Sequence, residues 1–142
     1  MSMTSKEIVI GLWRSFATRD AGQLRDHLAE AAVWTAPADN ATARLLGMPS
    51  RMHGREEIVR FIIDQLPRMF ARDVRTDLKG MYADGDTVVI EMTISATLAN
   101  GRAYKNEYCF IHQIADGKVV AIREFMDTYN GHRMTFGEAA TI

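Results

Sequence analysis

From Val74 onward the sequence alternates between apolar and polar residues, and three short turn signals interrupt this pattern. The turns are Ala83-Asp84-Gly85-Asp86, Asn100-Gly101 and Asp116-Gly117, and residues of these types tolerate the backbone conformations of tight turns. They divide the segment into four strands. Because connections this short cannot form a parallel crossover, the four strands are predicted to form an antiparallel meander.

The N-terminal part of the chain carries helical signals instead. Thr4 and Glu7 form a capping box ahead of apolar residues at helical spacing. Asp20 can cap a second, shorter helix. Gly54 precedes a third helix, which Pro67 is expected to distort or end because proline lacks a backbone N–H.

The remaining N-terminal segments complete a two-layer domain. A short strand is expected at 33–36, and residues 39–53 are expected to form a long loop. Helices that precede an antiparallel sheet define an α+β domain. The chain of 142 residues is long enough for one sizeable core, and no linker or repeat divides it. A single domain over residues 1–142 is therefore expected.

Composition narrows the classes of function. The net charge is −1 and no basic block is present, so no nucleic-acid partner is expected. No apolar run reaches the roughly 20 residues of a membrane span. The single Cys109 fits a reducing cytoplasm and is expected to pack as a small apolar side chain. His53 and His112 lack metal-ligand spacing, and no phosphate-binding loop is found, so neither a metal nor a cofactor is expected.

Polar and aromatic side chains share faces on the last two predicted strands. Alternate residues of a strand point to the same side of a sheet. One strand therefore groups Tyr104, Asn106, Tyr108, Phe110 and His112, and the next groups Val120, Ile122, Glu124 and Met126. If these two faces coincide, a carboxylate, an amide and a phenol meet among apolar groups, which is typical of a small-molecule pocket.

The order of these elements resembles a known family. The Gly-Arg-Glu-Glu-Ile run at 54–58, Asp-Gly-Lys-Val at 116–119 and Arg-Glu-Phe-Met-Asp at 123–127 are similar to the nuclear-transport-factor-2-like (NTF2-like) superfamily, and most of all to its SnoaL-like proteins and polyketide cyclases. The Tyr-x-Asn-x-Tyr run at 104–108 also resembles phenazine-biosynthesis A/B proteins. The resemblance implies a cone, with three N-terminal helices packed on a strongly curved, mainly antiparallel sheet.

The resemblance implies less about the reaction, because the superfamily hosts several enzyme classes and non-enzymatic binders. Ala36 stands where ketosteroid isomerases carry their general base. Glu124 matches the water-activating aspartate of limonene-epoxide hydrolases, but their other polar partners fall on Glu91-Met92-Thr93 and Ala36. Glu124 also matches the acid/base glutamate of phenazine-biosynthesis A/B proteins, whose partner histidine aligns with Phe61.

Glu124 is the candidate catalytic residue. Its neighbours Ile122 and Met126 favour an inward face, where burial would raise the pKa of the carboxyl group into the range useful for acid/base catalysis. The alternative is a surface carboxylate that pairs with Arg123 or Lys105.

Glu91 and Thr93 have two possible orientations. Alternation alone places the apolar face of their strand in the core and Glu91 in solvent. The family template implies the reverse, with Glu91 and Thr93 lining the pocket and an apolar outer face covered by a second subunit. That outer face would comprise Val88, Ile90, Met92, Ile94, Ile111 and Phe125. A homodimer through the outer face of the sheet is expected on this basis.

The other expected pocket residues are Trp34, Asn106, Tyr108, Ile122 and Met126. Trp34 could instead be a core residue, and Asn106 and Tyr108 could be only a sheet pair. Two functions remain open. The chain could be a cofactor-independent acid/base enzyme for a small, mostly hydrophobic oxygenated molecule, with an isomerisation, dehydration or ring closure as the reaction. It could also be a binding protein of the same shape.

Overall fold

The computed structural model describes residues 3–137, so the two ends of the expected domain, residues 1–2 and 138–142, lie outside this part. Its helices are α1 (Ser5–Thr18), α2 (Ala21–His27), α3 (Ala41–Leu46), α4 (Arg55–Arg60) and α5 (Thr128–Phe136). Its strands are β1 (Leu28–Thr35), β2 (Arg51–His53), β3 (Phe70–Asp84), β4 (Thr87–Leu98), β5 (Ala103–Ala115) and β6 (Lys118–Met126). All of the strands belong to one sheet in the order β2-β1-β6-β5-β4-β3.

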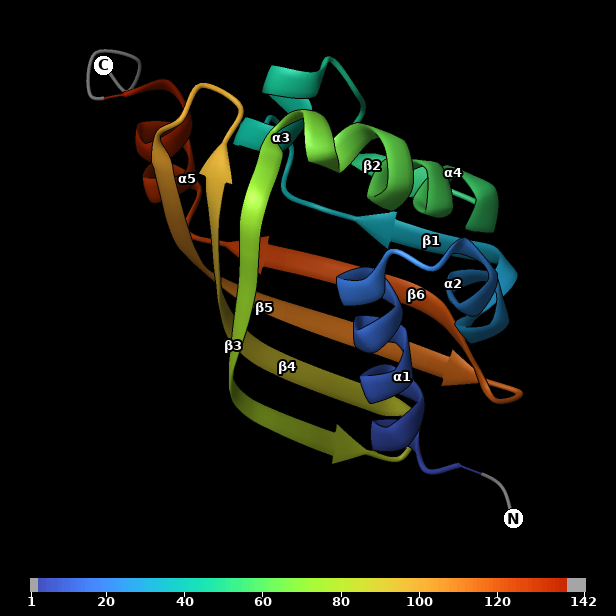
Figure 1. Ribbon diagram of the computed structural model, residues 1–142. Coiled ribbons are helices and arrows are strands. Elements are labelled where there is room, and N and C mark those ends of the chain that lie inside the picture. Colours follow the sequence, from blue (N-terminus) through green and yellow to red (C-terminus); the bar gives the residue numbers. More distant parts are fainter. Residues whose placement is uncertain (1–2, 138–142) are drawn as a thin grey trace.

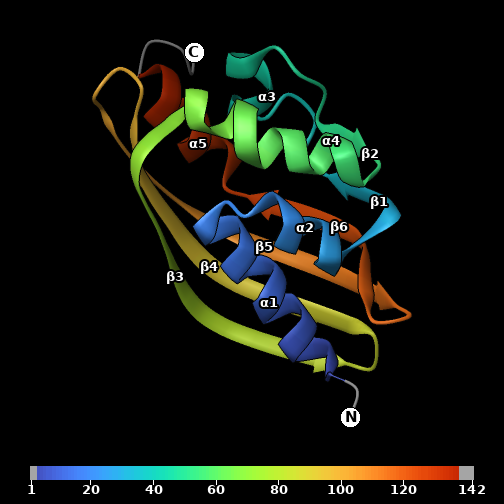
Figure 2. The same cartoon turned by 45° about the vertical axis from the view of Figure 1, so that its right-hand side comes forward.

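The sheet is strongly curved and mainly antiparallel. Strands β3 to β6 form the predicted meander, and only the pairing of β1 with β6 is parallel. The register of β3 against β4 shifts at three places, and such bulges bend and twist a strand. Helices α1, α2 and α4 lie on the concave side of the sheet (Figures 1 and 2). The predicted α+β cone is confirmed.

Local sequence signals account for the helices. The Thr4 hydroxyl accepts from Glu7 N, and the Glu7 carboxyl group accepts from Thr4 N, so the capping box is complete. Asp20 caps α2 through Gln23 N. Helix α4 continues into a π-helical turn, η1 (Phe61–Gln65), and a 3₁₀ turn, η2 (Leu66–Arg68). The distortion predicted at Pro67 is therefore present.

The segment over residues 39–53 was expected to be a loop, and this expectation is wrong. It contains α3, which Asn40 caps through Ala43 N and which ends at Gly47 with φ of 65°. Strand β2 then pairs with β1. A side chain at its N-terminus and a left-handed glycine at its C-terminus stabilise this short helix. Helix α5 was also not predicted.

The register across β4, β5 and β6 decides which face is inward. Met92 pairs with Tyr108 and Ile94 with Asn106, while Phe110 pairs with Glu124. The polar faces of β5 and β6 therefore coincide, because a register shift between Gln113 and Ile114 brings Glu124 opposite Phe110. They lie on the concave side together with the apolar face of β4, whose residues Val88, Ile90, Met92 and Ile94 are buried in the core.

Glu91 and Thr93 thus occupy the outer face of the sheet, and the orientation expected from the family template is wrong. Glu91 pairs with Cys109 and Thr93 with Glu107. Glu91 is exposed, whereas Thr93 is buried by its neighbours on that face. Burial of four aliphatic side chains outweighs any gain from an inward carboxylate on β4.

This correction also removes most of the expected apolar outer face. Of its six residues, only Ile111 and Phe125 lie on the outer side, and Phe125 is 48% exposed. The homodimer stays a prediction, and the apolar surface that supports it is smaller than expected.

His112 is a buried core residue. Its Nε2 accepts from Trp13 Nε1 at 3.0 Å, and its Nδ1 donates to the backbone carbonyl of Val88 at 3.0 Å. These two partners define the neutral tautomer with the hydrogen on Nδ1. Burial lowers the pKa of His112 to about 4.

Candidate functional site

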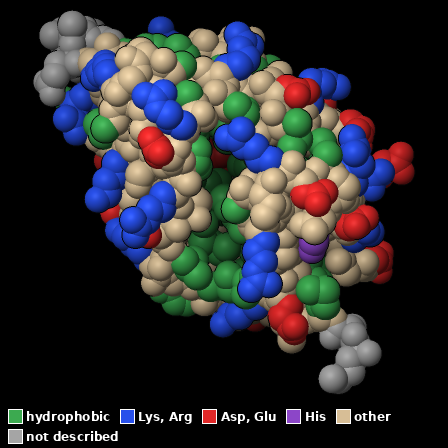
Figure 3. Space-filling model, viewed as in Figure 1, with side chains coloured by type: hydrophobic (Ala, Val, Ile, Leu, Met, Phe, Trp, Pro, Cys, Tyr) green, Lys and Arg blue, Asp and Glu red, His purple; other side chains and the backbone are tan. Residues whose placement is uncertain are grey.

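A cavity of about 210 Å³ lies between the concave face of the sheet and the helical layer formed by α1, α3 and the α4–η1 segment. Figure 3 shows its apolar floor as a hollow that opens at one side of the molecule. Aromatic side chains dominate the wall: Trp13, Phe16, Trp34, Phe61, Phe70, Tyr108 and Phe110. The mouth is bordered by β3, whose residues Val74 and Thr76 line the cavity and are exposed.

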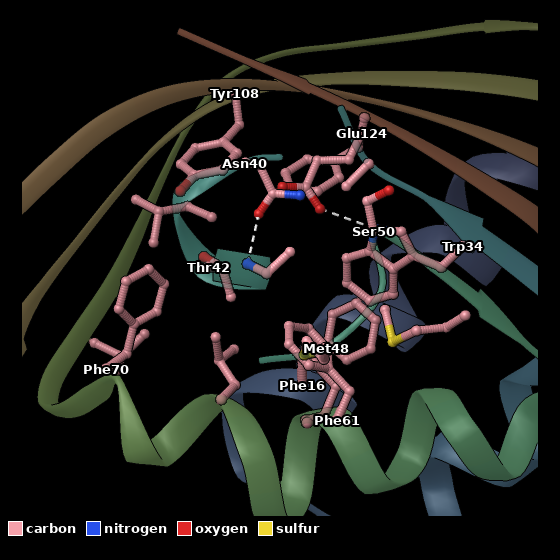
Figure 4. Close-up of a pocket in the computed structure, with 18 of the residues that line it drawn as sticks. Phe16, Trp34, Asn40, Thr42, Met48, Ser50, Phe61, Phe70, Tyr108 and Glu124 are labelled. Atoms are coloured by element: carbon pink, nitrogen blue, oxygen red, sulfur yellow. Dashed lines mark hydrogen bonds between the residues drawn. The ribbon is translucent and has the colours of Figure 1, made fainter. Parts of the chain in front are cut away.

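Glu124 projects from β6 into this cavity. Its Oε1 accepts a hydrogen bond from Trp34 Nε1 at 2.9 Å, and Trp34 comes from β1, the strand next to β6. Figure 4 shows both aromatic side chains, Trp34 and Tyr108, and polar ones, Asn40 and Ser50, near the carboxyl group. The second carboxyl oxygen has no hydrogen-bond partner within the described part of the chain.

This environment changes the acidity of Glu124. Burial raises the pKa of its carboxyl group from 4.5 to about 7, and the hydrogen bond from Trp34 opposes this rise. No lysine or arginine among residues 3–137 forms an ion pair with it, neither Arg123 nor Lys105. The structure therefore favours the inward placement over the alternative of a paired surface carboxylate.

The expected pocket residues separate into three groups. Trp34, Tyr108 and Glu124 line the cavity. Asn106, Ile122 and Met126 are on the same concave face but lie outside the lining, and Ile122 is a core residue. Glu91 and Thr93 are on the opposite face, as described above.

Asn106 is held by a local network beside the cavity. Its Nδ2 donates to the backbone carbonyl of Asp127 at 3.0 Å and to the Tyr104 hydroxyl oxygen at 3.3 Å. The hydroxyl oxygens of Tyr104 and Tyr108 are 2.6 Å apart. Asn106 therefore reaches the cavity through these two tyrosines and does not contact its interior directly.

Residues from the segment over 39–53 form the part of the wall that sequence reasoning missed. Asn40, Thr42, Met48 and Ser50 line the cavity; Figure 4 shows Asn40 and Ser50 near Glu124 and Met48 near Phe16 and Phe61. Neither the Thr42 nor the Ser50 hydroxyl group has a protein hydrogen-bond partner in the described chain. The Asn40 cap and the Gly47 stop are the sequence signals that could have located α3 itself.

Two residues named in the family alignment also face the cavity. Ala36 and Phe61 both line it, so the positions that carry a base or a histidine in the families mentioned above carry apolar side chains here. Phe61, Ile62 and Leu66 reach the cavity from the π-helical turn and the turn after it. Turns of this kind frequently occur at functional sites.

The described residues contain no group of three or more His, Cys, Asp or Glu side chains that could hold a metal ion. Among the helices of residues 3–137, none is both long and apolar enough to span a membrane.

Comparisons with known proteins identify the same fold. The SnoaL-like domain family matches residues 9–122, and the chain therefore belongs to this family. No curated protein gives a significant match. Solved structures match over nearly the whole chain, and three of them illustrate the range of proteins with this fold.

An NTF2-like protein of unknown function from Burkholderia pseudomallei is 23% identical and has a TM-score of 0.80, covering 93% of this chain and 97% of its own. An LEH-like epoxide hydrolase from M. tuberculosis is 17% identical with a TM-score of 0.70, covering 92% and 88%. A SnoaL-like polyketide cyclase candidate from Jannaschia is 15% identical with a TM-score of 0.75, covering 94% and 92%. At these identities the likeness confirms the NTF2-like fold and leaves the reaction open.

Proposed function

We propose that the protein is a cofactor-independent acid/base enzyme that acts on a small, mostly hydrophobic oxygenated molecule. Its reaction is an isomerisation, a dehydration or a ring closure, and Glu124 moves the proton. One observation carries the proposal: a carboxyl group with a pKa of about 7 lines an aromatic cavity without a cation partner in the described chain. A strongly shifted carboxyl group in a cleft is typical of a catalytic acid or base.

The geometry of Glu124 supports proton transfer in both directions. With a pKa of about 7, the acid and the carboxylate are both well populated near neutral pH, where general acid/base catalysis is most effective. Trp34 Nε1 donates to Oε1 and fixes the orientation of the carboxyl group. Oε2 is then left to exchange a proton with the bound molecule.

The cavity wall supports a compact apolar ligand with few oxygen atoms. Aromatic rings supply most of the contact surface, while Thr42, Ser50 and Tyr108 supply hydroxyl groups at separate points of the wall. A few polar groups among apolar ones fix the orientation of a ligand in such a site. Arg19 also borders the cavity, so the rim carries one basic side chain.

A binding protein without catalysis is the second candidate, and a specific observation favours it. Ala36 and Phe61 replace the polar partners that related enzymes place in the wall. Glu124 is therefore the only carboxyl group among the residues that line the described cavity. A single acid/base group suffices for a proton shift within one molecule, whereas a binding site needs none.

Hydrogen exchange into a ketone separates these candidates without knowledge of the natural substrate. 2-Tetralone is a compact aromatic ketone with acidic C–H groups beside its carbonyl, and NMR in D₂O follows the loss of these hydrogens. We expect the wild type to accelerate exchange, and Glu124→Gln to lower the rate about 10²- to 10⁴-fold, the usual contribution of general acid/base catalysis.

Glu91→Gln is the matched control, because it makes the same chemical change on the outer face, and its rate should equal that of the wild type. If 2-tetralone binds to all three proteins but exchanges no faster than in buffer, the binding-protein alternative holds instead.

A further inference from the structure

The hydroxyl group of Tyr108 ends a hydrogen-bonded chain that starts at the backbone. The chain runs from the carbonyl oxygen of Asp127 through Asn106 Nδ2 and the Tyr104 hydroxyl to the Tyr108 hydroxyl. Tyr104 is buried with 2% of its surface exposed, whereas Tyr108 lines the cavity. The position of each hydrogen along this chain decides whether the Tyr108 hydroxyl group donates a hydrogen bond to a ligand or only accepts one.

The orientation of the Asn106 amide is fixed by the backbone. Its Oδ1 accepts from Glu107 N at 2.9 Å, and its Nδ2 donates to the carbonyl oxygen of Asp127 at 3.0 Å. A backbone N–H can only donate and a carbonyl can only accept, so the reversed amide would lose both bonds. Helix α5 closes over this amide, since a Cβ atom on Gly131 would lie 3.2 Å from Asn106 Nδ2. The remaining hydrogen on Nδ2 therefore points to the Tyr104 oxygen.

The direction of the next bond follows from this orientation. Tyr104 accepts from Asn106, and within residues 3–137 the only other hydrogen-bond partner of its hydroxyl group is Tyr108. If Tyr108 donated to Tyr104, the hydrogen of Tyr104 would be buried without an acceptor, which is unfavourable. Tyr104 therefore donates to Tyr108. The hydrogen of Tyr108 then has no acceptor in the described chain and is left for the cavity.

We infer that Tyr108 is a hydrogen-bond donor to the ligand and that the ligand presents a carbonyl or an enolate oxygen to it. The inference rests on the proposed function only for the class of ligand. Tyr108 pairs with Met126, and Phe110 pairs with Glu124, so Tyr108 and Glu124 are diagonal neighbours on adjacent strands, within reach of one small molecule. The Tyr108 ring stacks on Phe110 with their centroids 5.6 Å apart.

This arrangement assigns separate roles to the two residues during proton transfer. The Glu124 carboxylate takes a proton from the carbon next to the carbonyl group. The electrons of the broken C–H bond move to the carbonyl oxygen, which becomes an enolate. The hydrogen bond from Tyr108 stabilises this charge as it forms. Where a C=C bond of the ligand is conjugated with the enolate, return of the proton from Glu124 to the far carbon of that bond re-forms the C=O group and completes an isomerisation without any co-reactant.

Neutron diffraction from crystals of the full chain grown in D₂O tests the direction of the hydrogens without any ligand. We expect the deuterium of Tyr104 to lie between the two tyrosine oxygens and the deuterium of Tyr108 to point into the cavity. A Tyr108 deuterium directed at the Tyr104 oxygen would overturn the inference, whether or not the protein is an enzyme.

Matched ligands test the consequence for binding. 2-Acetonaphthone and 2-isopropylnaphthalene have similar shapes, but only the ketone has an acceptor oxygen. We expect Tyr108→Phe to weaken the ketone about tenfold and to leave the hydrocarbon within about twofold, in line with the loss of one hydrogen bond. The C=O stretching frequency of the bound ketone should be lower in the wild type than in Tyr108→Phe.

Tyr82→Phe makes the same change at a residue that is 60% exposed and should alter neither measurement. Equal losses for the two ligands, or an unchanged C=O frequency, would mean that Tyr108 only packs against the ligand, and the inference would be wrong. A wild type that binds neither ligand would contradict the proposed ligand class, while the neutron experiment still decides the donor direction.

Discussion

Replacement of Glu124 by glutamine should change how the stability of the protein depends on pH. In the folded state, burial raises the pKa of this carboxyl group from 4.5 to about 7. Between these two values the folded protein holds a proton that the unfolded chain has released. The free energy of unfolding therefore falls as the pH rises through this range. The glutamine side chain of the Glu124→Gln variant does not titrate, so the variant lacks this contribution.

The size of this change in stability follows from the shift in the pKa of Glu124. Each pKa unit corresponds to about 1.4 kcal/mol, so a rise from 4.5 to about 7 corresponds to at most about 3.5 kcal/mol. The carboxyl group is reached by solvent from the cavity, so about 2 kcal/mol is a reasonable expectation. Relative to the wild type, the free energy of unfolding of Glu124→Gln should increase by this amount between pH 4.5 and pH 8. The increase should be complete slightly above pH 7.

Urea unfolding followed by circular dichroism at several pH values measures the difference. The comparison must be made between variant and wild type, because His112 acts in the opposite direction. Its pKa is lowered to about 4, so its contribution is present above pH 6.5 and is lost as the pH falls. His112 is unchanged in both proteins and cancels. A difference that stays constant from pH 4.5 to 8 would refute the raised pKa.

Three further predictions use the same geometry. The indole ¹⁵N–¹H signal of Trp34 should titrate near pH 7 with Glu124, while that of Trp13 should shift only near pH 4 with His112; a Trp34 signal that is flat from pH 5 to 8 would contradict the contact. Trp34→Phe removes a bond that lowers the pKa of Glu124, so the pH at half-maximal 2-tetralone exchange should rise, and an unchanged or lower midpoint would be inconsistent with this role. If the protein is a homodimer through the outer face of its sheet, Phe125→Glu should weaken the dimer in analytical ultracentrifugation, whereas a monomeric wild type at micromolar concentration would exclude that dimer.

Much of the fold could be predicted because its signals are local. The turn at Asp116-Gly117 joins β5 to β6 and places Ala115 opposite Lys118. The capping signals at Thr4 and Asp20 locate α1 and α2 for the same reason. In each case a few neighbouring residues determine the geometry, and distant contacts are not needed.

The candidate site could be predicted only in part, because alternation shows which residues share a face but not which face is inward. On β4, the apolar pattern alone correctly predicts that the apolar residues face inward. The family template predicts the opposite orientation, with Glu91 and Thr93 inward, and is wrong. The wall formed by Thr42, Met48 and Ser50 depends on where α3 packs and on the pairing of β2 with β1 at the sheet edge. Those contacts join residues far apart in the sequence, so local patterns could not reveal them.

The central claim is that Glu124 is an acid/base group with a pKa near neutrality, and carbon-13 NMR of its carboxyl carbon tests it most directly. Comparison of the wild type with Glu124→Gln assigns the signal. We expect a single titration with its midpoint near pH 7, the value to which burial raises this carboxyl group. A midpoint near 4.5, the ordinary value of a glutamate, would contradict the claim.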